Sequence, residues 1–219
     1  MGTRNLTCVQ KDGKIVIAKY CQWDGYPEGQ GAIILDFIHK EYDKDKFISQ
    51  LKNVKNATQE DWDEGWAKVG VIKGAITVTF EEAERMKKVC PQLTRDTGGK
   101  ILSIIQNWEN KYPLYIWRDY DFAKNGLFCE WGYVLNLDED TLDVYRGFGK
   151  EMVPSIFCDP EKDKPDEYGY CPINRIISIK ISDIKQNTIF PEFWEIFPEL
   201  WEREKEYIVK KIEKADSRE

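Results

Sequence analysis

Ten consecutive residues, Gln22–Gly31, combine two carboxylates, two large aromatic rings, one proline and three glycines. The carboxylates of Asp24 and Glu28 are suited to general acid or base work, and the rings of Trp23 and Tyr26 offer flat apolar faces to a ring-bearing ligand. Glycine and proline fix unusual backbone conformations, so the segment predicts a rigid ligand-binding loop. The alternative is a rigid corner whose aromatic side chains fill the core.

A second candidate segment, Arg95–Lys100, precedes an apolar run with helical spacing. Free backbone N–H groups and the helix dipole attract an anion at such a place, and Arg95, Lys100 and the Thr97 hydroxyl add charge and a donor. The segment is not a P-loop, because the first glycine is missing and Ile101 stands where serine or threonine is required. The alternative is an ordinary helix start with solvated charges.

Other residues able to do chemistry are few. His39 is the only histidine, which disfavours histidine-based metal sites and leaves a Ser-His-Asp triad dependent on this one residue. We expect it to be a surface or internally bonded residue, and we expect no metal and no cofactor. Six cysteines occur without a CxxC pair, which favours reduced, buried thiols. Of these, only Cys8 and Cys21, on the opening hairpin, are near the proposed site, and nothing in the sequence marks either as a nucleophile.

Arg4 lies at the start of the first expected strand, where an arginine is either positioned for binding or simply exposed. The candidate catalytic residues are Asp24 and Glu28. The candidate ligand-binding residues are Arg4, Gln22, Trp23, Tyr26, Arg95, Asp96, Thr97, Gly98 and Gly99.

The composition limits the classes of function. The chain has 219 residues, 32% of them charged and 13% aromatic, which is typical of a folded protein with a real core. A formal net charge of −7 disfavours binding of duplex nucleic acid, since such binders need a basic face. No apolar run reaches the length of a signal peptide or a membrane span, so we expect a cytoplasmic protein with no membrane partner.

The elements that must position these residues follow from periodicity and turn signals. Strands are expected at 3–9 and 15–23, joined by the Asp12-Gly13 turn, and the second strand leads into the loop. Helices are expected at 31–42, from 45 to 51, from about 58, at 79–89 and at 100–107, with capping boxes at Thr58 and Thr79. Further strands are expected at 114–117, 128–137, 142–148 and 173–181, and a long helix at 192–214.

Strands and helices come in groups and not in strict alternation. This pattern favours an α+β fold with a largely antiparallel sheet, opened by an N-terminal hairpin, packed with helices and closed by a long C-terminal helix. We expect a single domain over residues 1–219. Residues 55–78 and 158–170 are expected to be insertions or exposed loops, with 69–78 forming either a short strand or an irregular stretch.

Three motifs carry a resemblance: Met1-Gly2-Thr3-Arg4, the Trp23–Pro27 loop, and Glu130–Val134 followed by Leu137-Asp138. Over most of its length the chain resembles an uncharacterised family from bacteria, phages and fungi that begins MGTR and carries a WDGYP loop. The phage members suggest capture or degradation of a nucleotide signal of host defence. The opening hairpin is also distantly similar to N-terminal-nucleophile hydrolases, but Gly2 supplies no nucleophile.

Together these features predict a protein that binds a small, ring-bearing, anionic ligand, nucleotide-derived in our interpretation. The ring would stack on Trp23 or Tyr26, and the anion would lie at Thr97–Gly99 beside Arg95. Both sequestration and hydrolysis are open. The alternative is a non-enzymatic protein–protein interaction module with an acidic surface. The sequence leaves the oligomeric state undetermined.

Overall fold

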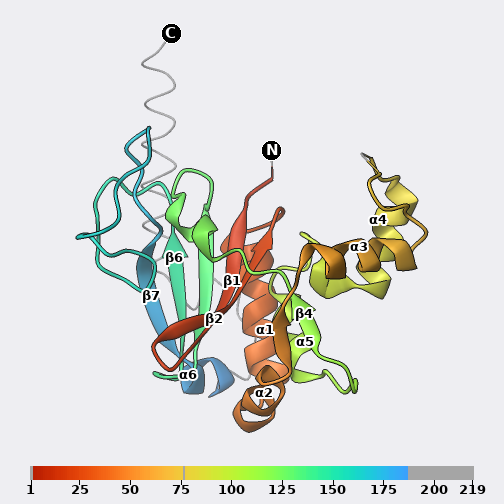
Figure 1. Ribbon diagram of the computed structural model, residues 1–219. Coiled ribbons are helices and arrows are strands. Elements are labelled where there is room, and N and C mark those ends of the chain that lie inside the picture. Colours follow the sequence, from red (N-terminus) through yellow and green to blue (C-terminus); the bar gives the residue numbers. More distant parts are fainter. Residues whose placement is uncertain (1, 76, 187–219) are drawn as a thin grey trace.

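The computed structural model describes residues 2–75 and 77–186, and they form an α+β fold (Figure 1). The strands are β1 (Asn5–Lys11), β2 (Lys14–Cys21), β3 (Val54–Asn56), β4 (Leu114–Ile116), β5 (Trp131–Asn136), β6 (Thr141–Arg146) and β7 (Asn174–Lys180). The α-helices are α1 (Ala32–Lys40), α2 (Lys44–Leu51), α3 (Gln59–Lys68), α4 (Phe80–Val89), α5 (Lys100–Gln106) and α6 (Ile181–Gln186). Short helical turns lie at η1 (Pro27–Gly31), η2 (Pro91–Leu93) and η3 (Tyr120–Lys124).

The main sheet has the strand order β2-β1-β5-β6-β7. Neighbouring strands are antiparallel except for β1 and β5, which are parallel, so the expectation of a largely antiparallel sheet opened by a hairpin is confirmed. The register places Thr7 opposite Lys19 on β2 and opposite Tyr133 on β5. Strand β2 is therefore an edge strand, and its outer side is open to another part of the chain.

The sheet has a core on each face. Helices α1, α2 and α5 cover one face, where Val9, Ile17 and Leu135 meet Ile34 and Ile101. A smaller apolar cluster covers the other face, with η3 and residues 156–157 contributing to it. Because side chains alternate along a strand, each buried strand supplies both cores.

A third, separate cluster lies beyond the edge strand. The parallel pair β3–β4, the helices α3 and α4, and η2 enclose Met86, Cys90 and Leu93, with Trp62 and Trp117 packed against them. In Figure 1 this part projects from the sheet on the side of β2. The space between the two parts is where the candidate site lies.

Local sequence signals fixed most of these elements. Both expected capping boxes are present, with Thr58 and Asp61 opening α3 and Thr79 and Glu82 opening α4. Strand β3, helix α6 and the turns η1, η2 and η3 were not predicted, since three to six residues carry too little periodicity. Residues 69–75 and 77–78 contain no strand. The helix expected at 192–214 lies outside the described residues.

Candidate functional site

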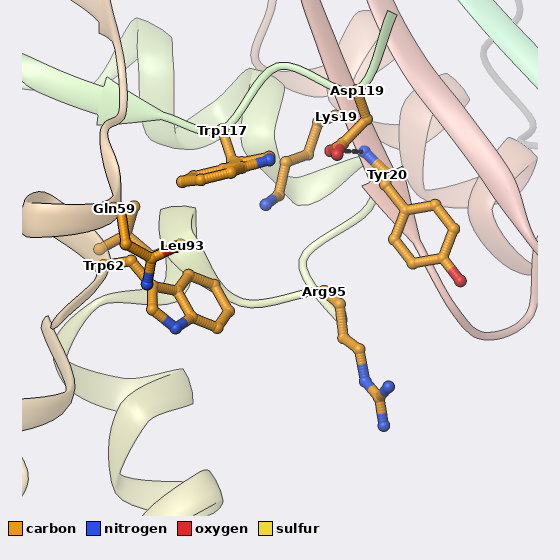
Figure 2. A pocket seen from close by; sticks show the side chains of 8 residues that line it. All are labelled: Lys19, Tyr20, Gln59, Trp62, Leu93, Arg95, Trp117 and Asp119. Atoms are coloured by element: carbon orange, nitrogen blue, oxygen red, sulfur yellow. Dashed lines mark hydrogen bonds between the residues drawn. The ribbon is translucent and has the colours of Figure 1, made fainter. Parts of the chain in front are cut away.

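The candidate site is a cavity of about 230 Å³ between the edge strand β2 and the α3–α4 part of the chain (Figure 2). Four separate segments line it, and each contributes either a ring or a group able to carry charge. The lining residues are Lys19, Tyr20, Gln59, Trp62, Leu93, Arg95, Trp117 and Asp119.

Lys19 is the most unusual of these residues. It lies on the face of β2 that also carries Ile17 and Cys21, so a charged side chain occupies a position at which the strand pattern buries its neighbours. Only 2% of Lys19 is exposed. Among the described residues its Nζ has neither a hydrogen bond nor an ion pair.

Burial lowers the pKa of Lys19 from 10.5 to about 8, because the charged form loses its hydration. The charge of Asp119 acts in the opposite direction and keeps the pKa from falling further. Next to Lys19 in the register, the buried hydroxyl of Thr7 has no hydrogen-bond partner among the described residues. Two neighbouring buried polar groups, the Lys19 amine and the Thr7 hydroxyl, therefore lack hydrogen-bond partners among the described residues.

Asp119 follows β4 and lies on the same side of the cavity as Tyr20. Its Oδ2 accepts a hydrogen bond of 3.1 Å from the Tyr20 backbone N–H, which fixes the carboxyl group beside the strand (Figure 2). Burial raises the pKa of Asp119, while this hydrogen bond and the charge of Lys19 lower it in part. A half-buried carboxyl with a raised pKa holds a proton more readily than an exposed aspartate does.

Two indole rings face the lysine from the other part of the chain. Trp62 on α3 and Trp117 after β4 pack edge to face with ring centroids 6.2 Å apart, and Trp66 in turn packs edge to face against Trp62. Figure 2 shows the Lys19 side chain between Trp117 and Asp119, with Trp62 and Arg95 at other parts of the lining. Aromatic faces beside a cation suit a planar ligand that bears negative charge.

Arg95 lies at the rim and its side chain is exposed. Its carbonyl oxygen accepts a hydrogen bond of 3.0 Å from the Gln22 N–H, so the two segments selected from the sequence are in direct contact. Tyr20 Oη donates to Gln22 Oε1 over 2.5 Å. The charges of Arg4 and Arg95 both act on the Tyr20 hydroxyl, where they oppose the rise of its pKa that burial causes.

The whole Gln22–Gly31 loop lies outside the cavity lining. Trp23 and Tyr26 are 46% and 40% exposed, and Asp24 and Glu28 are exposed as well. Asp24 has a positive φ of 53° and accepts a hydrogen bond of 3.2 Å from Tyr26 Oη. The loop is anchored through its backbone, since the Gly25 carbonyl accepts a hydrogen bond from Tyr133 Oη over 2.8 Å.

The Asp96–Gly99 turn is packed inside the protein. Gly98 and Gly99 are buried, and the Gly99 N–H donates to Gln30 Oε1 over 2.7 Å. Thr97 Oγ1 bonds to the Pro91 carbonyl, and Asp96 pairs with Lys87 at 2.9 Å. The Gly99 amide and the Thr97 hydroxyl expected to receive an anion are thus already used within the fold, and Arg95 is the part of this segment that faces the cavity.

The remaining candidates take internal roles. His39 Nδ1 lies 3.0 Å from the Ile184 carbonyl oxygen. Burial raises the pKa of the Cys21 thiol, and that of Cys8 as well, so neither is an activated thiolate. Within residues 2–75 and 77–186, no group of three or more histidine, cysteine or acidic side chains is arranged to hold a metal ion.

Seven lining residues were not selected from the sequence: Lys19, Tyr20, Gln59, Trp62, Leu93, Trp117 and Asp119. One signal pointed to the first of them. A lysine at an inward position of the alternating run Ile15–Cys21 breaks the apolar pattern, and a buried lysine requires a reason. Trp62, Trp117 and Asp119 carry no comparable signal, since only the packing of α3 and β4 brings them to β2.

No family model, no curated protein and no solved structure matches this chain. None of the helices within the described residues is long and apolar enough to cross a membrane.

Proposed function

We propose that this protein binds a small, ring-bearing, anionic ligand, nucleotide-derived in our interpretation, in the cavity between β2 and α3. The observation that carries the proposal is Lys19, a buried cation without a hydrogen-bonding or ionic partner among the described residues, in a cavity walled by two tryptophans. An unpaired buried ammonium is costly, and an anion that enters the cavity removes that cost.

The size of the cavity limits the ligand. Sites for drug-sized molecules usually enclose about 300–1,000 Å³. A cavity of about 230 Å³ lies just below that range, so one ring system with one anionic group fits better than a dinucleotide. A mononucleotide with its base in the cavity and its phosphate towards the rim meets this limit.

Each lining group then has a role. The ring stacks against Trp62 and Trp117, and Arg95 at the rim makes a charge-assisted hydrogen bond to the anion. Lys19 supplies the second positive charge from the β2 wall of the cavity. The class of ligand is the one expected from the sequence. Its ring, however, stacks on Trp62 and Trp117 and not on Trp23 and Tyr26.

The direct test has two parts: mass-spectrometric identification of small molecules that co-purify with the protein, and calorimetry with the four ribonucleoside 5′-monophosphates. A bound ligand at about 100 times its Kd stabilises the folded state by about 2.7 kcal/mol. For a chain of this size that raises the Tm by roughly 5–10 °C. No ring-bearing anion among the co-purified molecules, together with no shift and no heat for any nucleotide, would contradict the proposal.

The interaction-module alternative has its own observation. A larger groove of about 780 Å³ runs between α1 and α5, where Ile33 and Ile104 lie beside the acidic residues Glu28, Asp36 and Glu41. An apolar groove with an acidic rim suits a basic amphipathic segment of another protein. Partner binding that is lost on Ile33→Asp, yet unchanged by substitutions in the tryptophan-walled cavity, would favour this function.

A further inference from the structure

We propose that Lys19 is a nucleophilic amine, which forms an imine with an aldehyde or ketone group on a ring-bearing anion held in the cavity. The inference rests on the proposed function, because the tryptophans and Arg95 must first hold the ligand. It goes further by assigning covalent chemistry to a residue that plain binding would use only as a charge.

The first argument is the position of the amine. Lys19 lies in the wall of the cavity with 2% of its surface exposed, on a hydrogen-bonded strand that fixes its backbone. Its Nζ has no ionic partner among the described residues, so no carboxylate holds it in the protonated form by direct contact. The nitrogen is therefore presented to the cavity and not to the interior.

The second argument is the state of the amine. In the protein without ligand, a pKa of about 8 leaves about one tenth of Lys19 neutral at pH 7, whereas a lysine with the ordinary pKa of 10.5 is neutral in fewer than about one molecule per thousand. Only the neutral amine attacks a carbonyl carbon, and burial is a known way to activate lysine for this reaction.

The third argument is the neighbouring acid. Asp119 lines the same cavity, and its charge acts directly on Lys19. Burial raises the pKa of Asp119, so its protonated form is more available than that of an ordinary aspartate. The hydrogen bond from the Tyr20 N–H holds this carboxyl in place while it exchanges protons.

The reaction balances with these two groups alone. The Nζ lone pair forms a bond to the carbonyl carbon while the carbonyl oxygen takes a proton from Asp119, and Asp119 recovers a proton from the new ammonium. The carbinolamine nitrogen then expels the hydroxyl group, which leaves as water with the Asp119 proton. The products are a protonated imine on Lys19, the Asp119 carboxylate and one molecule of water.

The experiment uses the full chain with pyridoxal 5′-phosphate, a ring-bearing anionic aldehyde, followed by borohydride reduction and peptide mass mapping. Lys14 is the internal control, since it is an exposed lysine at the start of the same strand. We expect at least tenfold more reduced adduct on Lys19 than on Lys14 at pH 7. Lys14→Arg should leave the labelling of Lys19 unchanged.

Calorimetry with pyridoxine 5′-phosphate, which has an alcohol in place of the aldehyde, separates the two proposals. If this ligand binds but Lys19 is labelled no more than Lys14, the imine is overturned and the binding function stands. If it does not bind and Lys19 is not labelled, and no nucleotide binds either, both proposals fall.

Asp119→Asn tests the acid and keeps an oxygen that can accept from the Tyr20 N–H. We expect a slower labelling rate with an altered pH profile and unchanged binding of pyridoxine 5′-phosphate. The same labelling rate at every pH would remove Asp119 from the reaction. The labelling of Lys19 is compared with that of Lys14 within the wild-type protein. This comparison needs no variant, so a variant that fails to fold does not affect it.

Discussion

The backbone N–H of Gln22 donates a hydrogen bond of 3.0 Å to the carbonyl oxygen of Arg95. Gln22 directly follows the edge strand that carries Lys19, and Arg95 lies between η2 and α5. One backbone bond therefore holds the exposed cation of one segment beside the buried cation of another. Because backbone atoms make this contact, the Arg95 side chain can be changed without breaking it.

Arg95→Ala should weaken binding of a nucleoside monophosphate by about 1.5–3 kcal/mol, the usual contribution of a hydrogen bond to a charged group. The Tm should change little, since the side chain is exposed and the Gln22 bond is kept. A thermal melt and a binding isotherm on the same preparation check both statements. Arg85→Ala, an exposed arginine on α4, is the control. An unfolded Arg95 variant with full affinity per folded molecule would make Arg95 structural.

Substitution of single tryptophans measures how much each ring contributes to ligand binding. Trp62→Leu and Trp117→Leu should each weaken binding by about 1–3 kcal/mol, the range for stacking of one base on an aromatic side chain. Trp66→Leu removes a ring that contacts Trp62 but does not line the cavity, so its affinity should match the wild type. Trp23→Leu decides between the cavity and the loop. A loss of affinity confined to Trp23→Leu would show that the ring of the ligand stacks on the Gln22–Gly31 loop and not in the cavity.

Lys19→Met should stabilise the protein at pH 7. Lowering the pKa from 10.5 to about 8 corresponds to an unfavourable contribution of about 3 kcal/mol, because the unfolded chain binds the proton more tightly. The gain should be full below pH 8, decrease between pH 8 and 10.5, and vanish above. Denaturant unfolding at pH 7 and pH 10 measures it, with Lys14→Met as the control. If Lys19→Met is less stable than the wild type at pH 7, buried Lys19 does not destabilise the folded protein as proposed.

The pH dependence of binding follows from the same group. A bound anion favours protonated Lys19 and raises its pKa above the free value of about 8. Affinity for an aryl sulfonate, whose charge is constant in this range, should be level just below pH 8 and fall about tenfold per pH unit above it. Calorimetry from pH 6.5 to 9.5 measures the slope, and Lys19→Arg should flatten it. If the affinity of the wild type does not change with pH, Lys19 does not contact the anion.

Gly98 tests how the turn supports the Arg95 segment. Its φ is +49°, and a methyl group there would overlap the Gln30 amide that accepts from Gly99. Gly98→Ala should cost about 2–4 kcal/mol, from backbone strain and the lost hydrogen bond. Gly13→Ala, at a φ of +69° with open space around it, should show only the strain of about 1–2 kcal/mol. Equal costs in urea unfolding would show that the Gln30 contact contributes nothing.

Local signals in the sequence determined the α+β class, the opening hairpin and both capping boxes. Such features depend on residues close together in the chain: Thr58 finds Asp61 three positions away, and the Asp12-Gly13 turn sets the pairing of β1 with β2. The sequence likewise identified Arg95 and Gln22 as residues of interest, since unusual residue types gather around them.

Tertiary structure alone decided what faces the cavity. The parallel pairing of β1 with β5 leaves β2 at the edge, and the chain after β4 returns to that edge, where the Asp119 N–H donates to the Ala18 carbonyl over 2.8 Å. Trp62, Trp117 and Asp119 thereby line one cavity with Lys19. No periodicity encodes those contacts, because they join residues far apart in the chain. The pKa of Lys19 has the same origin: it falls because other segments exclude water from a lysine that would be ordinary on an exposed strand.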